Sequence, residues 1–239
     1  MNYIRYILLF FPFTTYCQSN EIVKLKVSYK TIIKKSNSIT VNDTCVLNIS
    51  NSYSYFYSRG KQKYDSMLLK FAGELLSKSL PGNQYKVEIP SIARYFPYGT
   101  YKQYKNSGSY LIRSLGKATY SYPINDIYNI RWDIKNDTRV INNLKCLKAI
   151  AKIDTSMVEV WFCPDIPISD GPAIYSGLPG LIIQSQSTSG LYIELISLEK
   201  NTNLKDINKY PVSYEEVTFK EFNNAIKAIR EKMRKGEYD

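Results

Sequence analysis

Few residues in this chain of 239 residues could carry chemistry, because histidine is absent. Without histidine, a Ser-His-Asp triad, a two-His-one-carboxylate iron site and His-ligated zinc are excluded. The best carboxylate pair is Asp165 and Asp170, which could act as acid and base or hold Ca²⁺ together with loop carbonyls. Acidic residues beside prolines more often form solvated turns. We therefore expect no catalytic residue, no metal ligand and no cofactor.

The cysteines predict one disulfide. Two strands are expected at Lys145–Ile153 and Met157–Phe162, joined by a short loop at Asp154 and Thr155. In that register Cys146 faces Cys163, and facing Cα atoms lie about 4.5–5.5 Å apart, within the range of a disulfide. Two alternatives stay open. Both thiols could be buried and inert, or Cys45 could be a partner.

The amino terminus has the features of an export signal. A positive charge at Arg5 precedes the short apolar run Tyr6–Tyr16, and a cut after Cys17 is predicted. The run is shorter than the roughly 20 apolar residues of a transmembrane helix, so no membrane span is expected. A lipidated Cys17 is the alternative. We expect residues 1–17 to be a signal peptide and residues 18–239 to form a single domain.

The rest of the chain predicts a mainly β fold with two amphipathic helices. Short apolar–polar alternating segments separated by brief turns are typical of antiparallel pairing, as one curved sheet or a sandwich. An apolar stripe at helical spacing predicts a helix at about 65–79, with Asp65 or Ser66 as its cap. A capping box formed by Thr218 and Glu221 begins a second helix at about 219–235.

The most informative segment is Pro164–Ile183, PDIPISDGPAIYSGLPGLII. It contains a stiff corner and a hexapeptide, made of Gly171, Pro172, Gly177, Leu178, Pro179, Gly180, Leu181 and Ile182. Pro179 followed by Gly180 suits a type II turn, Gly177 permits close backbone approach, and the leucines can anchor the turn in the core. We interpret these residues as a structural motif, with Asp165, Asp170 and Tyr175 as its possible exposed rim.

This hexapeptide, with similar motifs from about Tyr128 to Leu198, resembles the GLPGLI family of exported bacterial proteins. The resemblance implies export and a β-rich domain, but no established activity, cofactor or catalytic set. Cys163 departs from the family pattern. No active-site residue can therefore be carried over to this chain.

The net charge of +11 suits anionic lipids or polysaccharides of the cell envelope as partners. A nucleic acid is not expected, since no nucleic-acid-binding motif accompanies the charge. Our leading hypothesis is a non-enzymatic cell-envelope protein that binds a partner protein or an apolar or anionic ligand. It would be periplasmic, outer-membrane associated or secreted. The alternatives are a secreted carboxylate-dependent hydrolase and a structural or assembly accessory of outer-membrane systems.

Overall fold

The computed structural model describes residues 22–35, 38–78, 95–104, 108–115, 118–125, 128–200 and 214–235. The predicted signal peptide at residues 1–17, with Cys17, lies outside these residues. Within them, no helix is both long enough and apolar enough to cross a membrane.

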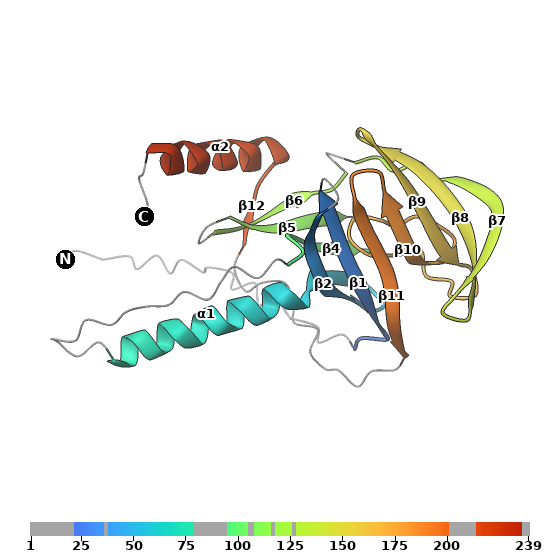
Figure 1. The fold of residues 1–239 in the computed structure, drawn as a ribbon, viewed down its shortest axis with the longest axis horizontal. Coiled ribbons are helices and arrows are strands. Elements are labelled where there is room, and N and C mark those ends of the chain that lie inside the picture. Colours follow the sequence, from blue (N-terminus) through green and yellow to red (C-terminus); the bar gives the residue numbers. More distant parts are fainter. Residues whose placement is uncertain are drawn as a thin grey trace, which may run out of the picture.

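Twelve strands form one open sheet in the order β12-β6-β5-β4-β3-β2-β1-β11-β10-β9-β8-β7. All neighbours are antiparallel except β12 and β6, which are parallel. The strands are β1 (Leu25–Lys35), β2 (Ser38–Ile49), β3 (Tyr53–Ser58), β4 (Gly99–Gln103), β5 (Ser109–Leu115), β6 (Ala118–Pro123), β7 (Asp133–Ile141), β8 (Leu144–Ile153), β9 (Ser156–Cys163), β10 (Leu181–Ser187), β11 (Leu191–Lys200) and β12 (Glu215–Glu216). The predicted mainly β class is confirmed, and the sheet is visibly twisted along its length (Figure 1).

Local sequence explains the tight hairpins. Asn142 and Asn143 both adopt positive φ between β7 and β8, as the central residues of a type I′ turn do. Asp154 has a φ of 54° between β8 and β9, where Ile153 faces Ser156. The register predicted for this second hairpin is therefore correct.

The two faces of the sheet differ. On the inner face, Val27 and Tyr29 of β1, Leu47 of β2 and Ile193 of β11 are fully buried and belong to the main hydrophobic core. On the outer face, the intervening β1 residues Lys30 and Lys34 are exposed to solvent. We use the names inner face and outer face in this sense throughout.

The helix α1 (Arg59–Lys78) begins earlier than the sequence predicted. Neither Asp65 nor Ser66 is its cap. The Ser58 hydroxyl accepts a hydrogen bond of 2.8 Å from the Lys61 N–H, which is the bond that an N-cap makes. The carboxylate of Asp43, from β2, accepts further bonds from the Ser58 hydroxyl and the Gly60 N–H. A residue distant in sequence thus fixes this helix start.

The helix α2 (Phe219–Lys235) agrees with its prediction. The Glu221 carboxylate accepts from the Thr218 N–H, and the Thr218 hydroxyl accepts from the Glu221 N–H at 3.2 Å, so the capping box is formed. The Phe222 ring is buried and stacks on Tyr122 of β6 at a centroid distance of 4.6 Å. This contact attaches α2 to the sheet.

Candidate functional site

The predicted structural motif lies in the connection between β9 and β10, where its apolar residues are core anchors. Leu178, Leu181 and Ile182 are all essentially inaccessible to solvent. Two glycines allow the backbone to pack tightly. A Cβ at Gly180 would lie 2.3 Å from the Cys163 carbonyl oxygen, and one at Gly171 would lie 2.7 Å from the Ile182 Cβ. The interpretation of this segment as a buried corner agrees with these positions.

The predicted type II turn is wrong. The Leu181 N–H donates to the carbonyl of Ile166, not to that of Leu178, and the Gly180 N–H bonds to the Leu178 carbonyl two residues back. Gly177 also has a different role from the one expected. Its φ is 91° and no atom lies near the position of a Cβ, so the backbone conformation is what favours glycine there.

The predicted exposed rim is corrected at two of its three residues. Asp170 is 1% exposed, and its Oδ1 lies 2.5 Å from the Nζ of Lys102, a buried lysine of β4. The Tyr104 hydroxyl donates to the other oxygen, Oδ2, at 2.7 Å. Burial, reinforced by the negative charge of Asp170, raises the pKa of Tyr104 well above its ordinary value. Asp170 is therefore part of an internal ion pair.

Tyr175 is buried as well, because its ring packs edge-on against Trp132, whose indole N–H donates to the Ser176 carbonyl at 2.8 Å. Its burial raises the pKa of the Tyr175 hydroxyl. Only Asp165 is exposed as predicted. Since Asp165 is in solvent and Asp170 is paired inside the fold, they do not form an acid–base pair. The described residues contain no cluster of three or more Cys, Asp or Glu side chains that could hold a metal ion.

Sequence reasoning missed Lys102 and Tyr104. Both belong to a tyrosine-rich segment whose strand boundaries could not be assigned from the pattern. The available signal was the single lysine in the Gly99–Gln103 strand, between residues that alternate toward the core. A lysine on an inner-face position requires a buried partner, but the sequence pattern does not identify Asp170 as that partner.

The predicted disulfide between Cys146 and Cys163 is not formed. Both are free thiols, as is Cys45, and all three are buried. The β8–β9 ladder runs from Ile153 opposite Ser156 to Leu147 opposite Phe162, and its pairing ends one position before the cysteines. The Cys146 Sγ lies instead 3.4 Å from the Leu144 carbonyl oxygen. Burial and the neighbouring Cys163 raise the pKa of Cys146 to about 11.

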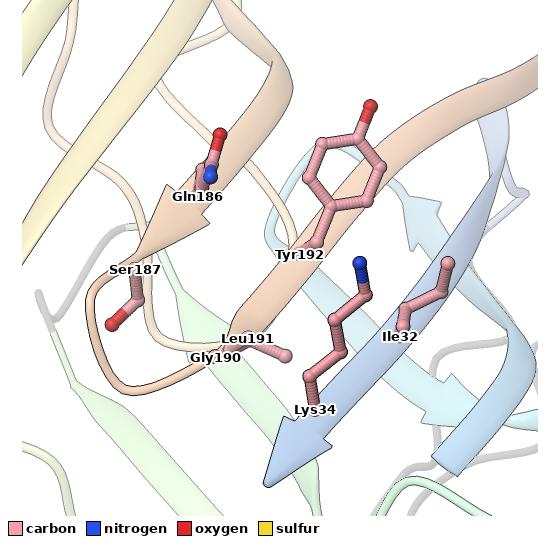
Figure 2. Close-up of a pocket in the computed structure, with 7 residues that line it drawn as sticks. All are labelled: Ile32, Lys34, Gln186, Ser187, Gly190, Leu191 and Tyr192. Atoms are coloured by element: carbon pink, nitrogen blue, oxygen red, sulfur yellow. The ribbon is translucent and has the colours of Figure 1, made fainter. Parts of the chain in front are cut away.

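A pocket of about 320 Å³ opens on the outer face, where β1 meets the β10–β11 hairpin. We call it the outer pocket. It is lined by Ile32, Lys34, Gln186, Ser187, Gly190, Leu191 and Tyr192. Figure 2 shows Ile32 and Lys34 from β1 and Tyr192 from β11 projecting toward this hollow. It combines aliphatic and aromatic surface with an amide, a hydroxyl and one cation.

Backbone geometry holds the outer pocket together. Gly190 has a φ of 91°, and a Cβ there would lie 2.2 Å from the Lys34 carbonyl oxygen. The Lys34 N–H donates to the Gly190 carbonyl at 2.9 Å. The hairpin turn therefore sits directly against the end of β1, and only glycine fits at this contact.

Hydrogen bonds orient the aromatic side of the pocket. The Tyr192 hydroxyl accepts from the Gln184 amide at 2.5 Å and donates to the Glu194 carboxylate at 2.6 Å. Burial and the bond to Glu194 raise the pKa of Tyr192. Because its hydroxyl has both partners, Tyr192 can offer its ring to a ligand in a fixed position.

The arrangement is an open β sheet with a buried, largely apolar inner face and a small pocket on its outer face. The family model described as "Protein of unknown function (Porph_ging)" matches residues 152–184, which span the end of β8, β9, the motif and the start of β10. No curated protein matches the chain.

Two solved structures of PNGF-II, in space groups C2 and P21, resemble the fold. Each has a TM-score of 0.56 and 14% identity over 85% of this chain. At that identity the likeness shows the fold alone. This chain spans about a third of the length of PNGF-II, 32% in one structure and 33% in the other.

Proposed function

We propose that this chain is an exported cell-envelope protein that binds a ligand or a partner protein on its outer face and catalyses no reaction. The observation that carries the proposal is the outer pocket, where the Tyr192 ring and Ile32 lie beside Lys34 and Gln186. Apolar walls with a few placed polar groups are typical of binding pockets. This lining suits a ligand that has both apolar surface and an anionic or hydrogen-bonding group.

The internal position of Asp170 supports binding over hydrolysis. A carboxylate that works as an acid or base must reach its substrate, whereas Asp170 is paired with Lys102 and is 1% exposed. The carboxylate hydrolase that the sequence suggested would have used this residue with Asp165. Because Asp170 is not accessible to a substrate, binding is better supported than hydrolysis.

Export is supported by the sequence. The amino-terminal charge and apolar run resemble a secretory signal, and the Gly177–Ile182 hexapeptide resembles the GLPGLI family of exported bacterial proteins. The Porph_ging match at residues 152–184 overlaps that hexapeptide. These features support our proposal that the protein acts in the periplasm, at the outer membrane or outside the cell.

The test of export is the intact mass of the protein from the envelope fraction. We expect a chain that lacks residues 1–17. An uncleaved chain in the cytosol would contradict this part of the proposal.

The test of binding is purification of the exported protein from its native envelope, followed by mass spectrometry of bound small molecules and proteins. Tyr192→Ala should lower the amount of co-purified ligand about tenfold, while Tyr192→Phe, which keeps the ring, should retain most of it. Met157→Ala is the control, because Met157 is 45% exposed and lies outside the pocket. Equal ligand recovery from Tyr192→Ala and the wild type would overturn the assignment of the site.

A further inference from the structure

A second hollow of about 490 Å³ lies beside the outer pocket, where β1 and β2 meet the start of α1. We call it the basic groove. Its lining is Lys30, Asn42, Asp43, Thr44, Arg59, Gly60, Lys63 and Ile196. Three of these side chains are cationic and solvent-exposed: Lys30 from β1, and Arg59 and Lys63 from α1. Lys30 lies on the same side of β1 as Ile32 of the outer pocket, two residues away.

The cations of the groove form no direct ion pair within the described part of the chain. None of the salt bridges among those residues involves Lys30, Arg59 or Lys63. One carboxylate, Asp43, lies in the wall, and it is only 9% exposed. Its oxygens accept from the Ser58 hydroxyl, the Gly60 N–H and the Phe96 N–H.

Glu194 is the other acid near the groove. It is the register partner of Lys30 across β1 and β11, and it accepts the Tyr192 hydroxyl bond. Asp43 and Glu194 are thus engaged by hydrogen bonds inside the protein. The three cations keep their donors for an external anion.

The same cations are unfavourable for the helix that carries two of them. Arg59 and Lys63 are four residues apart on α1, where like charges repel. They also lie at the helix end whose dipole is positive, and the first turn contains no acidic residue. Local features that weaken an element without a compensating contact are typical of functional sites.

We propose that the basic groove binds a multiply charged oxyanion of the phosphate class, carried by a phosphate ester or by a lipid headgroup. The planar guanidinium of Arg59 can donate two parallel hydrogen bonds to such a group, and Lys30 and Lys63 supply point charges. Three cations that line one groove suit a doubly charged oxyanion better than a single carboxylate. Asn42 and Thr44 provide further polar surface in the same wall.

The direct test is titration of the protein with inorganic phosphate, followed by calorimetry at low salt. The double variant Arg59→Gln/Lys63→Gln should weaken phosphate binding about tenfold or more. Its melting temperature should be equal to or higher than that of the wild type, because a repulsive pair has been removed. The control, Lys145→Gln/Lys152→Gln, removes the same charge from exposed positions of β8 and should leave the affinity within about twofold.

A second arm distinguishes the two sources of phosphate. Vesicles of phosphatidylglycerol, with phosphatidylcholine vesicles as the neutral reference, should bind the protein and be displaced by phosphate if a headgroup is the natural ligand. Phosphate binding without vesicle binding assigns the groove to a soluble phosphate ester. Absence of phosphate binding, or equal weakening in the β8 control, would overturn the proposal. Neither result bears on the outer pocket, since none of the substituted residues lines it.

Discussion

The buried Lys102 side chain joins β4 to the motif loop between β9 and β10. Its Nζ donates to the Asp170 carboxylate at 2.5 Å, to the Gly171 carbonyl at 2.8 Å and to the Tyr175 carbonyl at 3.0 Å. An ammonium has three N–H donors, so all of them have acceptors. A strand in the first half of the chain is thereby tied to the motif loop between β9 and β10.

Replacement of Lys102 should be costly. Lys102→Met leaves the Asp170 carboxylate buried without its counter-charge, and we expect a loss of about 3–5 kcal/mol in the free energy of unfolding. The double variant Lys102→Met/Asp170→Leu should lose less, since it removes both charges. Urea unfolding measures these differences.

The control for this prediction is Lys26→Met. Lys26 pairs with Glu199 at 3.0 Å, but both side chains reach solvent, so the loss should stay below about 1 kcal/mol. If Lys102→Met costs no more than Lys26→Met, the internal pair does not stabilise the fold as we argue.

The thiols should be present but unreactive in the folded protein. With a pKa of about 11, roughly 0.1% of Cys146 is thiolate at pH 8, and Cys45 and Cys163 are fully buried. A colourimetric thiol reagent should therefore detect almost no thiol in the native mature chain, and three after denaturation. Detection of a single thiol after denaturation would mean that Cys146 and Cys163 are bridged after all.

Single residues were predictable where the reason is local. Leu178 and Leu181 flank the Pro179-Gly180 pair, which favours a corner, so their burial could be inferred from the sequence. Asp170 could not be placed, because its partner Lys102 is 68 residues away in the chain. An acid beside prolines has the same local pattern whether it is solvated or paired inside the fold.

Helices and strands were likewise predictable where local sequence determines them and not where distant residues do. The β8–β9 hairpin was placed in its correct register because a two-residue loop and alternating strands determine it. The start of α1 was misplaced because its cap, Ser58, is the last residue of β3. The carboxylate that holds the Ser58 hydroxyl belongs to Asp43 of β2, which is distant in sequence. The apolar stripe from which the helix was predicted begins several residues after Arg59, the first residue of the helix.

The cap itself can be tested. Ser58→Ala removes the acceptor for the Lys61 N–H and one donor to Asp43, and should lower the free energy of unfolding by about 1–2 kcal/mol. Ser66→Ala is the matched control, because Ser66 is exposed and its hydroxyl donates to the Gln62 carbonyl of its own helix. It should change stability by less than about 0.5 kcal/mol. A larger loss in Ser66→Ala than in Ser58→Ala would contradict this assignment.

At the scale of the whole molecule, several tyrosines are buried in the interior. The chain has 22 tyrosines, and those of its core include Tyr29, whose hydroxyl donates to the Ile182 carbonyl at 2.8 Å. Burial raises the pKa of Tyr29, Tyr98 and Tyr175 well above the ordinary value, and partial burial together with the charge of Asp170 raises that of Tyr104. Two of these hydroxyls bond to the motif: that of Tyr29 donates to the Ile182 carbonyl and that of Tyr104 to the Asp170 carboxylate. They can donate only while they keep their protons.

This composition predicts alkaline unfolding. A tyrosine of the unfolded chain ionises near pH 10, while the buried ones resist ionisation. Because their pKa is higher in the folded state, their contribution is fully present below about pH 10 and is lost as the pH rises above it. We expect the urea midpoint to be nearly constant from pH 7 to 9 and to fall steeply beyond pH 10.

Tyrosinate absorbance at 295 nm, followed in parallel, should show one group of tyrosines that ionises gradually and a second that ionises only as the fold is lost. Complete ionisation near pH 10 with an unchanged urea midpoint would show that the core tyrosines are accessible, which contradicts the closed inner face on which the structural role of the motif depends.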